Sequence, residues 1–161
     1  MFTKYDRTRY PPEKPMMVWD GECGFCKYWV TRLKHLTGSS VLYAPYQEIH
    51  QGIKEISEKK FQKAIRLIDT NGKIYSGAGA AYKTLEKKPT WAFLISWYTT
   101  YPFFRAISDV VYRFVSNHRS SLFKVSKFLF GENPIKLHHY WICYLGILLL
   151  VVILLLNSIL T

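Results

Sequence analysis

The C-terminal end of the chain constrains the fold more than any other part of the sequence. The stretch from Trp141 to Leu160 is twenty residues long, and Asn157 and Ser158 are its only strongly polar residues. At about 1.5 Å per residue, a helix of this length matches the roughly 30 Å hydrocarbon core of a bilayer. A buried core helix is the alternative, but a domain of this size has no core that could enclose the segment on all sides. We therefore expect residues 137–161 to form a transmembrane anchor, with residues 141–160 in contact with the lipid bilayer.

The distribution of charge predicts how that anchor is oriented. The chain has 161 residues and carries 22 Lys and Arg against 11 Asp and Glu, which gives a net charge of +11. The last charged residue is Lys136, so basic residues precede the apolar segment and none follows it. The positive-inside rule then places the N-terminal domain in the cytoplasm, as part of a single-pass membrane protein. Residues 1–15 are charged and proline-bearing, which indicates an extended leader rather than a signal peptide.

The positive charge also bears on possible partners. An excess of Lys and Arg favours the anionic surface of a membrane leaflet. It would equally favour nucleic acid, but the sequence contains no recognition motif and no dense run of basic residues. Nucleic-acid binding is therefore not expected.

Residues 16–88 carry the signals of a small α/β domain. Apolar runs typical of buried strands flank a segment with helical spacing, and an Asn71-Gly72 pair indicates a hairpin between two further strands. The order strand, helix, strand, helix, hairpin and helix predicts an α/β sandwich around a small mixed sheet. The expected strands are Met16–Trp19, Val41–Ala44, Ala64–Ile68 and Lys73–Ser76, and the expected helices are residues 24–37, part of 47–63, and 77–85.

The composition changes after Pro89, and residues 89–136 are expected to form a helical extension. Residues 91–104 are almost wholly aromatic and apolar. Apolar side chains then recur at helical spacing, at Ile107, Val110, Val111, Phe114 and Val115. We favour helices packed on the sheet domain; shallow insertion of residues 91–104 at a membrane interface, which Trp and Tyr would suit, stays open.

One constellation indicates chemistry, the C-x-x-C formed by Cys23 and Cys26 between the first expected strand and helix. At the start of a helix, unpaired N–H groups and the positive end of the helix dipole favour a thiolate at Cys23. Cys26 follows one turn later, close enough to form a disulfide, and would be the resolving thiol. Lys27 adds positive charge nearby, whereas Asp20 and Glu22 oppose thiolate formation. We therefore expect the pKa of Cys23 to be lowered, but only moderately.

Other assignments of the two cysteines fit the sequence less well. A structural zinc site needs four ligands, and neither a second C-x-x-C nor a suitably spaced His pair is present. The third cysteine, Cys143, lies at the start of the apolar segment. We expect neither a metal nor an organic cofactor. A metal-binding module and a non-enzymatic membrane-bound adaptor are the alternative functions.

The run VWDGECGFC, residues 18–26, resembles the DGxCxxC signature of the DCC family of thiol-disulfide oxidoreductase-like proteins. Residues 69–81 look like the hairpin-to-helix segment of that family, and residues 112–119 resemble a late segment, so the resemblance covers roughly residues 16–125. It implies a thioredoxin-like fold and a thiol or disulfide substrate. It also places Asp20, Cys23 and Cys26 in the motif positions.

The resemblance leaves the roles of several residues open. Asp20 would either accept a proton from Cys26 or fix the turn before the helix. Asn117 and Arg119 match the late segment, and we expect them to cap a helix or to pack. No proline stands immediately before the strand at Ala64–Ile68, where a thioredoxin carries the cis-proline that guides a substrate backbone. The sequence thus predicts a membrane-anchored thiol-disulfide oxidoreductase, and the missing proline weakens the expectation that it handles extended peptides like a general reductase.

Overall fold

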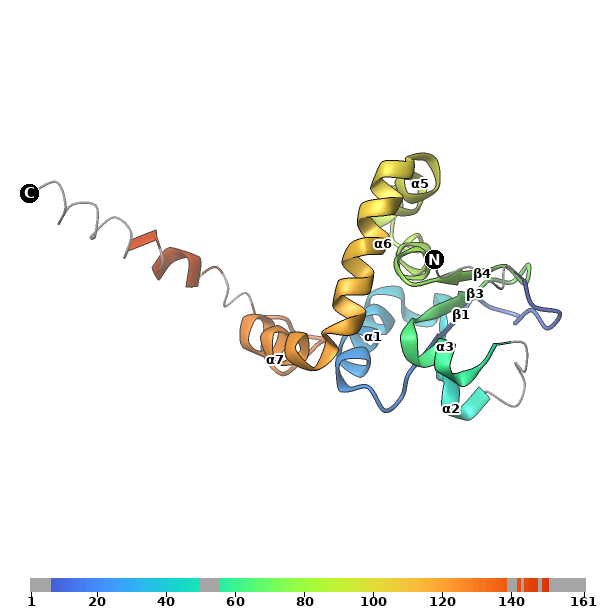
Figure 1. Ribbon diagram of the computed structural model, residues 1–161, viewed down its shortest axis with the longest axis horizontal. Helices are drawn as coiled ribbons and strands as arrows, with labels where there is room; N and C mark the ends of the chain where they lie inside the picture. Colours follow the sequence, from blue (N-terminus) through green and yellow to red (C-terminus); the bar gives the residue numbers. More distant parts are fainter. Residues whose placement is uncertain (1–6, 50–55, 139–141, 143, 148, 151–161) are drawn as a thin grey trace, which may run out of the picture.

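A four-stranded mixed sheet forms the centre of the protein, whose computed structural model describes residues 7–49, 56–138, 142, 144–147 and 149–150. The strand order is β2-β1-β3-β4 (Figure 1). Strand β1 pairs in parallel with β2 and antiparallel with β3, and β4 pairs antiparallel with β3. The strands are β1 (Met16–Trp19), β2 (Leu42–Pro45), β3 (Arg66–Ile68) and β4 (Ile74–Ser76). This mixed sheet, flanked by helices, fits the expected thioredoxin-like fold, although β3 and β4 are shorter than the sequence predicted.

The parallel pairing of β1 and β2 requires a crossover, which α1 (Gly24–Thr37) provides. The sequence predicted this helix with the same bounds. It ends at Gly38, whose φ of 58° lies in the left-handed region that favours glycine. A short 3-10 turn, η1 (Gly38–Ser40), leads into β2, and α2 (Tyr46–Ile49) and α3 (Glu58–Lys63) follow it.

The hairpin between β3 and β4 confirms the turn predicted at Asn71-Gly72. Gly72 has a φ of 79°, and its N–H donates to the carbonyl of Asp69 at 2.9 Å. The leader meets this turn, because the N–H of Thr8 donates to the carbonyl of Gly72 at 2.9 Å. The expected extended leader therefore contacts the sheet domain from Arg7 onward, through a bridge to Lys73.

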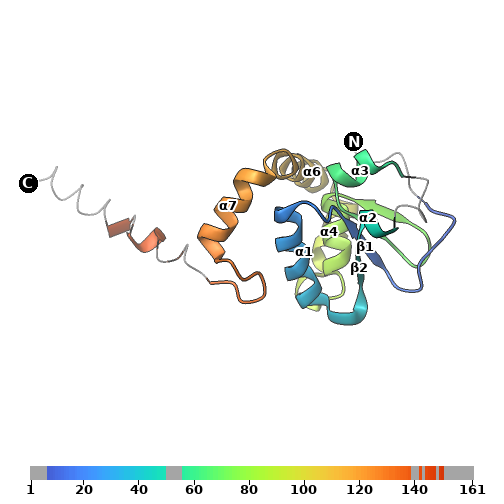
Figure 2. The same ribbon diagram turned by 90° about the horizontal axis from the view of Figure 1, so that it is seen from below.

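The two faces of the sheet carry separate apolar clusters, because alternate side chains of a strand point to opposite faces. Val18 and Ile68 pack on one face with Phe61 of α3, while Met17 and Leu67 pack on the other with Ala80. Ala80 belongs to α4 (Ala78–Leu85), which lies beside α1 on that second face (Figure 2).

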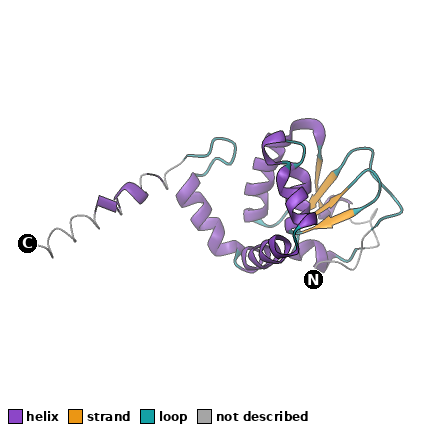
Figure 3. Ribbon diagram, turned by 90° about the horizontal axis from the view of Figure 1, so that it is seen from above, coloured by secondary structure: helices purple, strands orange, loops and turns teal. Residues whose placement is uncertain are grey.

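Three further helices extend from the sheet domain, as Figure 3 shows. They are α5 (Phe93–Thr100), which follows the 3-10 turn η3 (Pro89–Trp91), α6 (Pro102–Asn117) and α7 (Arg119–Phe130). Helix α5 packs against α4 and α6, and α7 packs against α1. These contacts place the three helices against one another and against the sheet domain. Insertion of residues 91–104 at a membrane interface stays a prediction.

The side of α6 that is buried differs from the apolar side that its sequence pattern predicted. Ile107, Val110, Val111 and Phe114 are exposed, while Ser108 is buried toward the domain. The inner side of α6 combines an aromatic contact with hydrogen bonds: the ring of Phe104 packs on that of Tyr82, and the Tyr82 hydroxyl donates to Ser108 at 3.2 Å. The helical spacing therefore predicted the helix correctly but not the face that it buries.

The expected transmembrane helix falls mostly on residues outside the described part of the chain. Among the described residues, no helix is both long and apolar enough to span a bilayer. Residues 139–141, 143, 148 and 151–161 lie outside them, so most of the predicted span, including Cys143, has no structural description here.

Two tyrosines that must stay protonated in the fold predict a loss of stability at alkaline pH. Burial raises the pKa of Tyr43 to about 12, and its hydroxyl lies 2.8 Å from Oγ1 of Thr37. Burial, together with the carboxylate of Asp109 that accepts its hydrogen bond at 2.8 Å, also raises the pKa of Tyr98. Above a pH of about 10 the unfolded chain releases these protons while the folded protein keeps them.

We therefore expect the contribution of these two tyrosines to the free energy of unfolding to be constant below about pH 10 and to fall as the pH rises above it. Urea unfolding at a series of pH values measures this. In Tyr43→Phe the decline should be shallower, because one of the raised pKa values is gone. An equal slope in both proteins would contradict the assignment to Tyr43.

Candidate active site

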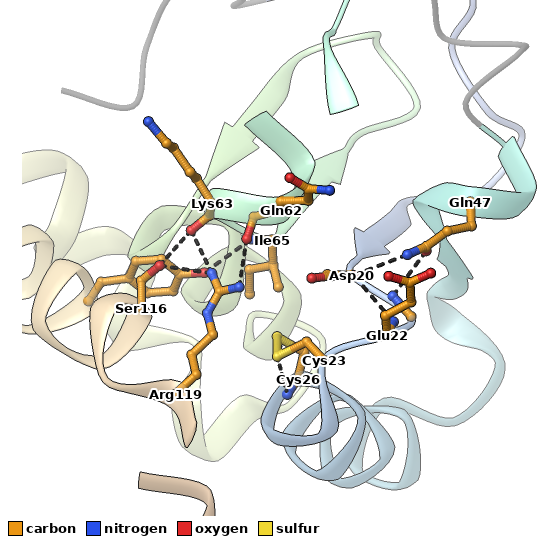
Figure 4. Close-up of a disulfide and its surroundings, with 12 residues drawn as sticks. Asp20, Glu22, Cys23, Cys26, Gln47, Gln62, Lys63, Ile65, Ser116 and Arg119 are labelled. Atoms are coloured by element: carbon orange, nitrogen blue, oxygen red, sulfur yellow. Dashed lines mark hydrogen bonds between the residues drawn. A yellow bond between two sulfur atoms is a disulfide. The ribbon is translucent and has the colours of Figure 1, made fainter. Parts of the chain in front are cut away.

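The two cysteines lie at the start of α1, just after the turn that follows β1. Cys23 is the N-cap of α1, and its sulfur accepts a hydrogen bond from the N–H of Cys26 at 3.2 Å. Cys26 is one turn inside the helix and only 7% exposed. The two residues form a disulfide, with their Cα atoms 5.2 Å apart (Figure 4). The structure thus brings together the two sulfurs that the sequence paired.

The turn before the helix is held by the Asp20 side chain. Its Oδ1 accepts hydrogen bonds from the N–H of Glu22 at 3.2 Å and from Nε2 of Gln47 at 3.1 Å. Its backbone carbonyl accepts from the N–H of Cys23 at 3.2 Å. Gln47 also accepts from the N–H of Gly21 at 3.0 Å, so it joins α2 to the turn. No sequence signal pointed to Gln47, because an isolated Gln has no motif.

Position 21 requires a glycine, because neighbouring side chains leave no space for a Cβ atom there. A Cβ atom at this position would lie 2.8 Å from Cβ of Pro45 and 3.0 Å from Oε1 of Gln47. Carbon atoms do not approach this closely without displacement, so a larger residue would push the turn away from β2. The close approach keeps the loop that carries Cys23 against the end of the parallel strand pair.

The segment that faces the disulfide comprises residues 62–65, at the end of α3 and in the link to β3 (Figure 4). Three side chains of the helical extension hold this segment in place. Arg119 donates to the carbonyls of Gln62 and Lys63, both at 2.6 Å. Ser116 donates to the same carbonyl of Lys63 at 2.6 Å. Tyr112 accepts a hydrogen bond from the N–H of Ile65 at 3.1 Å. We call Tyr112, Ser116 and Arg119 the loop clamp.

The loop clamp shows what residues of the late segment, 112–119, contact in the structure. Arg119 was expected to cap a helix or to pack, and no role was predicted for Tyr112 or Ser116 in that segment. The structure places them against a backbone loop 47 to 57 residues earlier in the chain. No local pattern encodes such a contact.

A cavity of about 730 Å³ adjoins the disulfide between α1, α4, α6 and α7. The side chains around it are mostly apolar, and Cys26 forms part of its wall; among the others are Phe25, Trp29, Ile65, Leu85 and Leu122. Phe25, Trp29, Leu33 and Leu36, the apolar stripe that the sequence placed on α1, line this cavity and are only half-buried. The buried sulfur of the pair therefore borders an apolar space of the size that ligand pockets have.

Helix α7 closes this side of α1. The ring nitrogen of Trp29 donates to Ser126 at 3.2 Å, and the hydroxyl of Tyr28 donates to the carbonyl of Gly131 at 2.8 Å. A Cβ at Gly24 would lie 3.0 Å from the ring of Phe123 on α7. The start of α1, and with it the N-cap cysteine, is thus packed directly against the extension.

The positive end of α1 favours a thiolate at Cys23 once the disulfide is reduced, whereas the nearby carboxylates of Asp20 and Glu22 oppose it. Helix α1 has fourteen residues and carries no acidic residue in its first turn, so its positive end faces the Cys23 sulfur unopposed from within the helix. Thiolates are the nucleophiles in thiol–disulfide exchange. In the described part of the chain, no group of three or more His, Cys, Asp or Glu side chains is placed to hold a metal ion.

A mixed sheet with a C-x-x-C at the N-terminus of its crossover helix defines the class of dithiol–disulfide oxidoreductases. Comparison with protein families agrees: the model described as DCC1-like thiol-disulfide oxidoreductase matches residues 17–125. The match covers well over half of the chain, and the protein belongs to this family. Searches of curated proteins and of solved structures returned no significant match.

The loop clamp can be tested with an arginine substitution. Arg119→Met removes the hydrogen bonds to the carbonyls of Gln62 and Lys63. We expect the free energy of unfolding to fall by about 1–2 kcal/mol, since hydrogen bonds to a charged group contribute about this much at a partly exposed site. The rate at which reduced Cys23 is alkylated should change as well, because the segment facing it is released.

Arg113→Met is the matched control. Arg113 lies on α6 like two members of the clamp, but its Nε reaches only the carbonyl of Asp109 in the same helix, at 3.4 Å. Its unfolding free energy should stay within about 0.5 kcal/mol of the parent protein, with an unchanged alkylation rate. Equal effects of the two substitutions would show that the clamp has no special role.

Proposed function

We propose that Cys23 is the nucleophile and Cys26 the resolving thiol of this oxidoreductase. The observation that carries the proposal is the position of Cys23 as the N-cap of α1, with Cys26 buried one turn inside. The Cys23 thiolate attacks one sulfur of a substrate disulfide, which forms a mixed disulfide and releases the other substrate sulfur as a thiolate. Cys26 then attacks the Cys23 sulfur, which releases the reduced substrate and leaves the Cys23–Cys26 disulfide. The same steps in reverse oxidise a substrate dithiol.

The family implies thiol or disulfide substrates, and the site favours those with an apolar portion next to the reacting sulfur. Two observations support this choice. The cavity beside Cys26 is lined mostly by apolar side chains. In addition, the loop clamp already occupies the carbonyls of Gln62 and Lys63 and the N–H of Ile65. An extended peptide could therefore not pair with these backbone groups without displacing the clamp.

For Asp20 we propose the role of holding the turn. Its Oδ1 accepts two hydrogen bonds that fix residues 20–22 against Gln47. These bonds account for the side chain without a proton-transfer step. The alternative assignment, proton acceptor for Cys26, is tested below.

We further propose that the chain is held in a membrane by residues 137–161, with the sheet domain on the cytoplasmic side. The support is the uncharged sequence after Lys136 together with the basic charge before it. The described part of this segment also leaves large apolar side chains exposed to solvent, such as Ile147, Leu149 and Leu150. Side chains of this kind are stable in a lipid environment.

The division of labour between the sulfurs predicts different outcomes for the two serine variants. Cys23→Ser should abolish exchange and mixed-disulfide formation together, because a hydroxyl is not ionised near neutral pH. Cys26→Ser should keep the first attack and lose resolution, so covalent adducts with the substrate accumulate. Mass spectrometry of the adducts, and alkylation of each single-cysteine variant against pH, measure both effects. Cys23 should react with an apparent pKa below about 8.5, and Cys26 slowly throughout.

Asp20→Asn serves as the comparison variant, since an Asn oxygen can still accept the two hydrogen bonds of the turn. Resolution of the mixed disulfide should then proceed at the parent rate, with a small loss of stability. Slower resolution would assign proton transfer to Asp20. Equal and slow alkylation of both cysteines at every pH would contradict the catalytic roles and favour the adaptor.

The anchor is tested by deletion and by a reporter. Without residues 138–161, the protein should become extractable from membranes by carbonate, because its apolar segment is gone, and should keep the near-ultraviolet circular dichroism of the full chain. A reporter fused after Thr161 should lie on the opposite side of the membrane from Cys23. Carbonate extraction of the full chain, or a reporter on the same side as Cys23, would rule out a spanning anchor.

A further inference from the structure

Helix α6 leaves five of its large apolar side chains exposed on the side away from the domain. In a helix that covers a soluble domain, the apolar stripe faces the core. In α6 the side toward the domain combines the ring of Phe104, which packs on Tyr82, with polar contacts: Ser108 meets Tyr82, Asp109 accepts from Tyr98, and the clamp residues bind the segment 62–65. The opposite side, which we call the outer face, is formed by Phe103, Ile107, Val110, Val111 and Phe114.

The outer face is both large and exposed. Its five side chains are between 46% and 78% exposed, and their spacing makes them one continuous stripe along the helix. At the N-terminal end of α6, Tyr101 is 56% exposed, and its ring lies 6.4 Å from that of Trp97 on α5, itself 48% exposed. A contiguous apolar stripe of this kind marks an interaction surface. Aromatic rings with a polar tip at its end are typical of a membrane–water interface.

Charge indicates which partner covers the outer face. Residues 91–132 contain five Lys and Arg against two acidic residues, Asp109 and Glu132. Arg119 belongs to the loop clamp and Lys127 pairs with Glu132 at 3.5 Å, so the exposed basic residues of α6 and α7 are Arg105, Arg113 and Lys124. The carboxylate of Asp109 is engaged by Tyr98 on the inner side of α6. In a symmetric dimer through the outer face, this excess of positive charge would face itself, which disfavours a second copy. An anionic lipid surface offers the complementary charge as well as an apolar interior.

The position of α6 agrees with this partner. Figures 1 and 2 show α6 and α7 on the side of the sheet domain toward which the described part of the C-terminal segment extends. The ring of Phe128 on α7 stacks on that of Tyr144 in this segment, with centroids 4.6 Å apart. The extension and the apolar segment are therefore adjacent in space as well as in sequence.

We propose that the outer face of α6, with the aromatic side chains at its N-terminal end, lies in the interface of an anionic bilayer. The catalytic domain is then fixed on the membrane surface by its own helices, in addition to any tether through residues 137–161. Neither the family match nor the redox chemistry of the cysteine pair assigns such a contact.

Site-specific photocrosslinking of the full chain tests the contact. A photoreactive phenylalanine is placed at Val110, or in a duplicate variant at Val111, and the protein is incorporated into vesicles of phosphatidylcholine with phosphatidylglycerol. The control carries the probe at Thr70, an exposed residue in the turn between β3 and β4. Figure 1 shows this turn at the end of the sheet away from α6. The control is tethered equally, so it separates contact from mere proximity to the membrane.

We expect about fivefold more lipid adduct from the outer face than from Thr70, and a drop of several-fold when phosphatidylglycerol is replaced by phosphatidylcholine. Near-ultraviolet circular dichroism confirms that each labelled protein is folded. Adducts between two copies of the chain would overturn the proposal and assign the face to a dimer. Equally weak lipid labelling at both positions would overturn it in favour of a domain held away from the bilayer. Both results are independent of whether the cysteine pair is active in exchange.

Discussion

The hydrogen bond from the Cys26 amide to the Cys23 sulfur joins the fold of this protein to its chemistry. A helix begins with backbone N–H groups that have no partner within the helix, and here a cysteine sulfur satisfies one of them. The group that starts α1 is therefore also the sulfur for which we propose the nucleophilic role. The parallel pairing of β1 and β2 requires α1 as a crossover, so the position of the reactive sulfur follows from the topology of the sheet. Asp20, Gly21 and Gln47 then fix the turn that delivers the chain to this point.

The two sulfurs lie in different surroundings, which is what an exchange reaction in two steps requires. Cys23 is partly exposed and accepts a hydrogen bond at the positive end of a helix, whereas Cys26 is buried and borders an apolar cavity. On the proposed assignment, a substrate sulfur reaches Cys23, while Cys26 is protected from competing reactions until the mixed disulfide forms.

The helical extension follows the sheet domain in the sequence, and its side chains also form part of the candidate active site. The loop clamp binds three backbone groups of the segment that faces the disulfide, and α7 packs on the first turns of α1. The inner side of α6 makes these polar contacts together with the packing of Phe104 on Tyr82, and five of its apolar side chains stay on the outside. On the proposal made above, a lipid surface covers this exposed stripe.

The sequence by itself determined the local features of this protein. Met16–Trp19, residues 24–37 and the Asn71-Gly72 hairpin could be predicted because each depends on neighbouring residues, through side-chain periodicity, helix ending at glycine or turn chemistry. The pairing of Cys23 with Cys26 could be predicted for the same reason. Only the tertiary structure decided which side of α6 is buried, that Gln47 secures the turn, and that Tyr112, Ser116 and Arg119 hold the segment opposite the disulfide. These contacts join residues 26 to 57 positions apart, and the spacing within α6 is the same whichever side is buried. The choice rests on hydrogen bonds to a distant loop, which no local pattern encodes.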